Sequence, residues 1–184
     1  MLGNIDTGVL EGLYHMRSDG LVNLFLFLST IGETAVMLVV TLMVALLLYF
    51  WFGMRKTALG LIATMATSTA ITYVLKHVVA RARPDILYEA YAETGFSFPS
   101  GHSSAAAAFC GFFMYVAWTK MAPGPRRTLL ISAAFCYIVL MAFGRLYLGV
   151  HYLSDVAVGI VIGVFAAAVG AYTMRIMQKR SWFI

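Results

Sequence analysis

Apolar residues in this chain form long blocks, without the alternation of a half-buried strand or the one-sided stripe of a surface helix. Five blocks cover residues 35–53, 57–79, 102–121, 128–148 and 152–174, and each is apolar on every helical face. A helix needs about 20 mostly apolar residues to cross the hydrocarbon core of a bilayer. Helices that are apolar all round are buried in lipid or in a bundle. The pattern predicts an all-α, polytopic transmembrane helical bundle with five spans.

The first 32 residues differ from these blocks. Residues 4–17 carry apolar positions at roughly helical spacing, interrupted by charge, and residues 21–32 are apolar but too few to span a bilayer. We expect an interfacial helix followed by a short helix packed on the bundle. A sixth, partly polar span is the alternative. Residues 1–184 are therefore predicted to form a single membrane-embedded domain, with an external helical segment over 1–32 and the main helix bundle over 33–178.

Composition supports a membrane environment. Hydrophobic residues make up 61% of the chain and charged residues 11%, whereas soluble domains carry roughly 25% charged residues. The formal net charge is +5, but no run of Lys and Arg with interleaved aromatic residues is present. We therefore expect no nucleic-acid partner.

The placement of charge predicts an orientation. With five spans, eight of the 13 basic residues fall on one side, and all eight acidic residues fall on the other. Lys and Arg collect in cytoplasmic loops, so the basic side is assigned to the cytoplasm, with the N-terminus outside and the C-terminus inside. The eight basic residues are Arg55, Lys56, Lys120, Arg126, Arg127, Arg175, Lys179 and Arg180.

Ionisable residues near the outer ends of the spans are candidates for function, because charge at membrane depth is costly. Lys76 and Arg83 are seven residues apart, which places them on one face if the helix continues to Pro84. Two cations on one face suit a phosphate, which arginine grips with paired hydrogen bonds and lysine attracts as a point charge. The alternative is a pair of basic side chains that extend to the membrane surface.

A second group opens the third block. Ser100 is a suitable N-cap, and Gly101 leaves backbone N–H groups open to an anion at a helix start. His102 would then lie beside that anion and could transfer a proton. The alternative is an ordinary capped helix start with an interfacial histidine.

The third group is Arg145, His151 and Asp155. His151 and Asp155 are four residues apart and would meet on one face of a helix. A carboxylate at one ring nitrogen fixes the tautomer and leaves the other nitrogen free to attack. The alternative is a buried pair that only steadies two helices. The predicted topology brings all three groups to one face of the membrane. Separately, the spacing of Gly159 and Gly163 favours close packing of the last helix against a neighbour.

These residues together resemble the three-part signature of the type 2 phosphatidic acid phosphatases, a family that shares its site with vanadium haloperoxidases. The matching parts are Lys76-x6-Arg83-Pro84, Pro99-Ser100-Gly101-His102 and Arg145-x5-His151-x3-Asp155, within residues 33–175. Two features depart from the family. Gly144 stands where a serine usually precedes the arginine, and we expect the chain to lack the first of the six spans of many bacterial members.

The resemblance implies a role for each site residue. His151 would be the nucleophile that forms a phosphohistidine, Asp155 would orient it, and His102 would be the general acid. Lys76, Arg83 and Arg145 would hold the phosphate oxygens, with hydrogen bonds from Ser100 and Gly101. No metal and no cofactor are implied.

The expected function is hydrolysis of a lipid phosphomonoester or diphosphate, with undecaprenyl diphosphate favoured and phosphatidylglycerol phosphate or phosphatidic acid as alternatives. The expected partners are this lipid and the bilayer, and the oligomeric state is left open. The expected location is a bacterial inner membrane, with the site on the periplasmic or extracellular side. A haloperoxidase using vanadate conflicts with five apolar spans. A non-catalytic anion-binding or transport protein is the alternative from another class.

Overall fold

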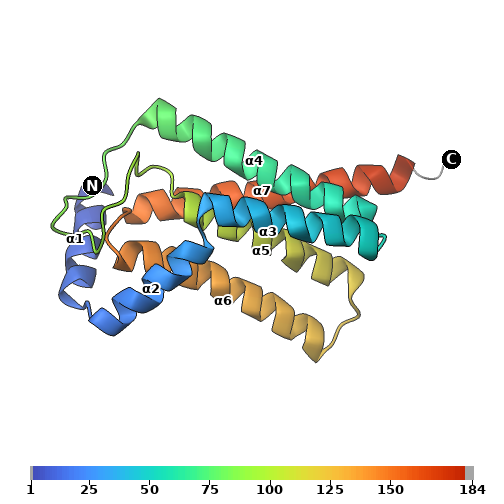
Figure 1. Ribbon diagram of the computed structural model, residues 1–184, viewed down its shortest axis with the longest axis horizontal. Helices are drawn as coiled ribbons and strands as arrows, with labels where there is room; N and C mark the ends of the chain where they lie inside the picture. Colours follow the sequence, from blue (N-terminus) through green and yellow to red (C-terminus); the bar gives the residue numbers. More distant parts are fainter. Residues whose placement is uncertain (1, 181–184) are drawn as a thin grey trace.

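Seven α-helices and one π-helical turn form the described part of the chain, residues 2–180 of this computed structural model. No strand occurs within these residues, as the all-α prediction requires. The elements are α1 (Leu2–His15), α2 (Asp19–Ile31), α3 (Thr34–Leu46), η1 (Leu47–Trp51), α4 (Arg55–Val79), α5 (Gly101–Lys120), α6 (Pro125–Tyr147) and α7 (Leu153–Arg180). The short helices α1 and α2 and the long α4–α5 connection lie at one end, and the C-terminal end of α7 lies at the other (Figure 1).

Four helical segments are both long enough and apolar enough to cross a membrane. They are Thr34–Trp51, Arg55–Val79, Pro125–Tyr147 and Leu153–Met177. The 20-residue α5 is not among these four segments; it begins with the polar residues His102, Ser103 and Ser104 and is rich in small alanine side chains. It packs against α4, α6 and α7, so these small side chains bring neighbouring helices close to one another instead of facing lipid.

Residues 2–31, for which a sixth span was the alternative prediction, form two short helices. At 1.5 Å per residue, α1 (14 residues) and α2 (13 residues) are each about 20 Å long, short of the roughly 30 Å hydrocarbon core. The chain turns between them at Met16–Ser18. Both helices contact α6, and α1 also contacts α7. Residues 2–31 therefore form a packed cover at one end of the bundle, and neither of their helices is long enough to cross a bilayer.

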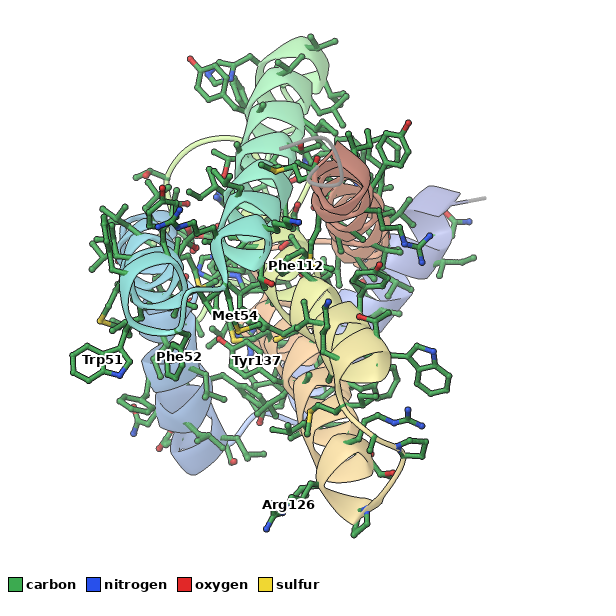
Figure 2. All side chains as sticks on the ribbon, turned by 90° about the vertical axis from the view of Figure 1, so that its right-hand side faces the viewer. Trp51, Phe52, Met54, Phe112, Arg126 and Tyr137 are labelled. Carbon is green, nitrogen blue, oxygen red and sulfur yellow. The ribbon has the colours of Figure 1, made fainter. Side chains whose placement is uncertain are left out.

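Glycines on α7 allow the close helix packing expected of Gly159 and Gly163. A Cβ on Gly159 would lie 2.6 Å from the Ser100 carbonyl oxygen, and one on Gly163 would lie 2.5 Å from the Ser104 carbonyl oxygen. The side chain of Phe112 is completely buried between the helices, whereas Trp51 and Arg126 point outward at the opposite end of the bundle, which faces the viewer in Figure 2. This packing holds the start of α5 against the start of α7, where the second and third motifs lie.

Gly170 provides a test of the α4–α7 packing, because a Cβ there would lie 1.8 Å from Thr64 Oγ1 and 2.4 Å from the Gly60 carbonyl oxygen. We expect Gly170→Ala to lower the free energy of unfolding by about 2 kcal/mol, the usual cost of overpacking, measured by thermal unfolding in detergent. Gly12→Ala is the matched control, because nothing lies within 4 Å of a Cβ at Gly12. Equal stability of the two variants would contradict this account of the packing.

Candidate active site

The three motifs of the sequence meet at the end of the bundle that carries α1 and α2 (Figure 1). The last turn of α4, the first turn of α5 and the α6–α7 connection all lie there, although they are far apart in sequence. The Ser100 backbone N–H donates to the Asp155 carbonyl oxygen at 3.0 Å and joins the second motif to the third. Arg83 Nη1 donates to the Val150 carbonyl oxygen at 2.8 Å and joins the first motif to the third.

Lys76 and Arg83 do not share a helix face, and this expectation was wrong. Helix α4 ends at Val79, and Ala80 adopts a left-handed conformation with φ 48°. The chain turns away before Pro84, so Arg83 lies in the connection. Both cations nevertheless bind the same part of the α4–α5 connection. Lys76 Nζ donates to the Phe96 carbonyl, and Arg83 Nε donates to the Gly95 carbonyl at 3.0 Å. The loop, and not the helix, gathers them.

Ser100 caps α5 as predicted, because its side chain accepts from the Ser103 backbone N–H. His102 follows in the first turn. Its Nε2 lies 3.1 Å from the Ser29 carbonyl oxygen and 3.3 Å from Ser29 Oγ. The ring of His102 is therefore oriented by α2, from the N-terminal segment that no motif covers.

Arg145 is completely enclosed at the end of α6, with 1% of its surface exposed. Nη1 donates to Ser29 Oγ and, at 2.8 Å, to Tyr91 Oη, and Nη2 donates to Glu93 Oε2. Nε has no partner among the described residues. A buried cation with a free donor is well suited to binding an anion.

The structure gives a packing reason for Gly144, the position where the sequence departs from the family pattern. A Cβ at Gly144 would lie 2.8 Å from Cδ1 of Phe25 on α2. Ser29 lies one turn further along α2 and places its hydroxyl beside Arg145 and His102. A hydroxyl is therefore present in the site, but it comes from α2 and not from position 144.

His151 and Asp155 are neighbours, but they do not lie on one helix as expected. His151 precedes α7, which starts at Leu153, and Asp155 occupies its first turn. His151 Nδ1 lies 3.7 Å from Asp155 Oδ2, which is an ion-pair distance and too long for a hydrogen bond. The same carboxylate oxygen accepts the Tyr152 backbone N–H at 2.9 Å, as in a capping box. The N-terminus of α7 thus fixes the carboxylate behind the imidazole.

Glu93 was not among the predicted site residues, yet its carboxylate lies between two of the predicted cations. It bonds Arg145 and lies 3.7 Å from Arg83 Nη2. Burial acts to raise the pKa of Glu93, but Arg145, Tyr91 and Arg83 outweigh it and lower that pKa to about 2. The carboxylate is therefore charged at neutral pH and marks a position where two guanidinium groups hold an anion.

The imidazole of His151 is kept neutral by its surroundings. Burial lowers the pKa of His151 to about 4, with the charges of Arg145 and Arg83 acting in the same direction and Asp155 opposing them. A neutral imidazole has a free lone pair, which a nucleophile needs. With Nδ1 facing Asp155, the other ring nitrogen, Nε2, is the one available for attack.

Taken together, the described residues offer a neutral imidazole backed by a carboxylate, a second histidine and a set of buried cations. Within that part of the chain, no group of three or more His, Cys, Asp or Glu side chains is arranged to hold a metal ion. The arrangement can bind an anion, attack it with a ring nitrogen and supply a proton from His102.

Comparisons with known proteins relate this chain to phosphatases. The model of the PAP2 superfamily matches residues 57–182. Phosphatidylglycerophosphatase B of Bacillus subtilis (strain 168) is 28% identical over 162 residues, which is 86% of this chain and 77% of that protein. A dihydrosphingosine 1-phosphate phosphatase (C823.11) of Schizosaccharomyces pombe is 26% identical over 151 residues, 78% of this chain but 36% of that longer protein.

Two solved structures share the fold. The crystal structure of a transmembrane PAP2-type phosphatidylglycerolphosphate phosphatase from Bacillus subtilis has a TM-score of 0.80 at 23% identity, covering 97% of this chain and 86% of that one. The crystal structure of Aquifex aeolicus LpxE has a TM-score of 0.70 at 22% identity, covering 91% and 94%. Because the family model matches more than half of the sequence, the chain belongs to the PAP2 superfamily and is a membrane-embedded phosphoric ester hydrolase of the metal-independent type.

Proposed function

We propose that this protein removes the terminal phosphate from a lipid phosphomonoester through a phosphohistidine on His151. The observation that carries the proposal is the anion position between Arg83 and Arg145, at which Glu93 now lies. A phosphate bound there would replace the Glu93 carboxylate and take up the free Nε donor of Arg145. In this proposal Lys76 adds a charge, and Ser100 and Gly101 at the start of α5 add hydrogen bonds.

In the first step, Nε2 of His151 attacks phosphorus, and the bond to the lipid oxygen breaks. His102 donates its proton to the departing oxygen, and Asp155 supports the imidazole as it becomes positively charged. In the second step, water attacks the phosphohistidine, His102 accepts a proton from that water, and phosphate leaves. The three cations stabilise the charge on the phosphoryl oxygens in both steps.

A groove beside Lys76 supports entry of the lipid from the side. It has a volume of about 150 Å³ and opens between α3, α4 and the start of α5. Met37, Leu38 and Met65 give it an apolar wall, and Lys76 and Gly101 lie at its polar end. An acyl chain in this groove would bring its headgroup to the cations without leaving the bilayer.

The five-span topology belongs to the same proposal. With α5 counted as a span, Arg55, Lys56, Lys120, Arg126 and Arg127 lie at the end of the bundle away from the site. The positive-inside rule then assigns that end to the cytoplasm and the site to the periplasmic or extracellular face of a bacterial inner membrane. Family membership favours this enzyme over an anion-binding transport protein.

Our choice of lipid substrate rests on the names of the relatives. The two relatives described above are named for phosphatidylglycerophosphate and dihydrosphingosine 1-phosphate, both lipid phosphomonoesters. We therefore place phosphatidylglycerol phosphate first and phosphatidic acid second. Undecaprenyl diphosphate, favoured from the sequence, becomes the competing substrate, because no observed feature of the site selects a diphosphate.

The test is a panel of substrates offered to the purified protein in detergent with a chelator present. Phosphatidylglycerol phosphate, phosphatidic acid, undecaprenyl diphosphate and soluble glycerol 3-phosphate are compared by phosphate release. We expect the highest kcat/KM for phosphatidylglycerol phosphate and weak release from the soluble ester, which cannot use the groove. Fastest release from undecaprenyl diphosphate would move the assignment to a diphosphatase, and loss of all release in chelator would contradict the metal-free mechanism.

A further inference from the structure

A buried carboxylate on α1 lies next to the proposed catalytic pair, although α1 lies outside the matched family region and all three motifs. Asp6 has 4% of its surface exposed. Its Oδ2 lies 2.9 Å from Arg81 Nη2 and accepts Ser154 Oγ–H at 2.6 Å. Its Oδ1 accepts the Ser154 backbone N–H at 3.0 Å. A side chain from α1 therefore satisfies a backbone donor in the first turn of α7.

Arg81 joins this carboxylate to the one behind His151. Its Nη1 donates to Asp155 Oδ1 at 2.7 Å and to Ser154 Oγ at 2.7 Å, while Nη2 bonds Asp6. The guanidinium carbon lies 3.9 Å from the centre of the Tyr152 ring. Four groups thus contact the Arg81 guanidinium: two carboxylates, the Ser154 hydroxyl and the Tyr152 ring.

The two oxygens of Asp155 consequently have separate partners. Oδ1 is bonded to Arg81, and Oδ2 accepts the Tyr152 N–H and faces His151 Nδ1. A carboxylate fixed at both oxygens cannot rotate away from the imidazole. If Arg81 kept its full charge, however, it would draw electron density from Asp155 and weaken its support of a positive His151. The negative charge of Asp6 offsets part of the positive charge of Arg81.

We propose that Arg81 and Asp6 are positioning residues for the His151–Asp155 pair, with Arg81 aiming Asp155 and Asp6 offsetting the charge of Arg81. This inference rests on the proposed role of His151 as the nucleophile. It assigns the N-terminal helix α1 a part in catalysis through contacts alone, since Asp6 touches neither His151 nor any of the predicted phosphate-binding residues.

The pH dependence of kcat/KM separates charge tuning from simple support. The free enzyme is active only when His151 is neutral, so activity falls as the pH drops through the pKa of His151. Removing a positive charge near Asp155 raises that pKa, and removing a negative charge near Arg81 lowers it. The charged and titratable groups facing the pair are Arg83 and Lys76 from the α4 side, His102 on α5, Tyr152 before α7 and Arg145 on α6, which is itself bonded to Glu93.

The experiment compares Arg81→Gln, Asp6→Asn and the double variant in detergent, using phosphatidic acid as the probe. We expect Arg81→Gln to move the acidic limb of kcat/KM to higher pH and Asp6→Asn to move it to lower pH, each by roughly half to one unit. The double variant should lie between them. Arg81→Gln should also lower kcat, and Arg81→Lys should lower it less, because lysine keeps the charge but not the forked geometry.

Two controls keep the outcomes distinct. Arg126→Gln and Asp19→Asn remove exposed charges of the same kinds away from the pair, and both should leave the limb in place. Thermal unfolding of each variant shows that it is folded. Limbs that stay fixed, or move in the same direction in both single variants, would overturn the inference. If His151→Ala kept wild-type activity, the proposed function itself would fail, which is a different result.

Discussion

Replacing His151 with alanine should lower phosphate release from every lipid substrate by roughly 10⁴-fold or more, because the variant loses the group that we propose forms the covalent intermediate. The site geometry leaves little to replace it. His102 is bonded toward Ser29, and Asp155 lies behind His151, fixed to Arg81 and the Tyr152 N–H. The measurement is the rate of phosphate release in detergent. Brief acid-free quenching with labelled substrate should also trap an alkali-stable phosphohistidine in the native protein only.

His77→Ala is the matched control for this variant. His77 lies on the exposed surface of α4 beside Lys76, and its ring contacts Tyr73 and Phe96. This control should keep nearly the native rate and the trapped intermediate. A His151→Ala protein that is folded and retains a rate within tenfold of the native one would show that another residue is the nucleophile.

Replacing His102 with alanine should have the next largest effect, and the size should depend on the leaving group. General acid catalysis contributes about 10²- to 10⁴-fold, and a lipid alkoxide needs the proton to depart. An aryl phosphate with an acidic phenol needs it far less. We therefore expect a loss of about 10³-fold on phosphatidic acid and a much smaller loss on such an aryl ester.

The comparison of the two esters decides the role of His102. An equal loss on both would mean that His102 only shapes the pocket. Ser29→Ala should have an intermediate effect on activity. It removes the hydroxyl near His102 Nε2 but leaves the carbonyl contact that also orients the ring. That variant should lose activity in the same leaving-group-dependent way, but by less than His102→Ala.

Local sequence patterns predicted well wherever the feature depends on neighbours along the chain. Apolar blocks marked the positions of α3 to α7, because each block must bury its backbone polar groups in helical hydrogen bonds. Ser100 was recognised as an N-cap from its position before a helical run, and the Gly159–Gly163 pair as a close-packing face. The spacing within the motifs identified residues that the fold does bring together.

The same reasoning failed where a helix end had to be located. Lys76 and Arg83 were placed on one face by extending α4 to Pro84, but the helix stops four residues earlier at a left-handed Ala80. His151 and Asp155 were placed on one helix, but α7 begins between them. In both cases periodicity set the relative positions correctly only for as long as the helix continued.

The sequence by itself determined the class of the protein, an all-helical membrane bundle, and its three spaced motifs of ionisable residues predicted where the site lies. Only the tertiary structure decided which other residues share the site. Glu93 fills the anion position, Ser29 orients His102, and Asp6 reaches Asp155 through Arg81. Nothing in their local sequence marks these three residues, because their contacts join segments more than 50 residues apart and arise only when α1, α2 and the α4–α5 connection fold over the end of the bundle.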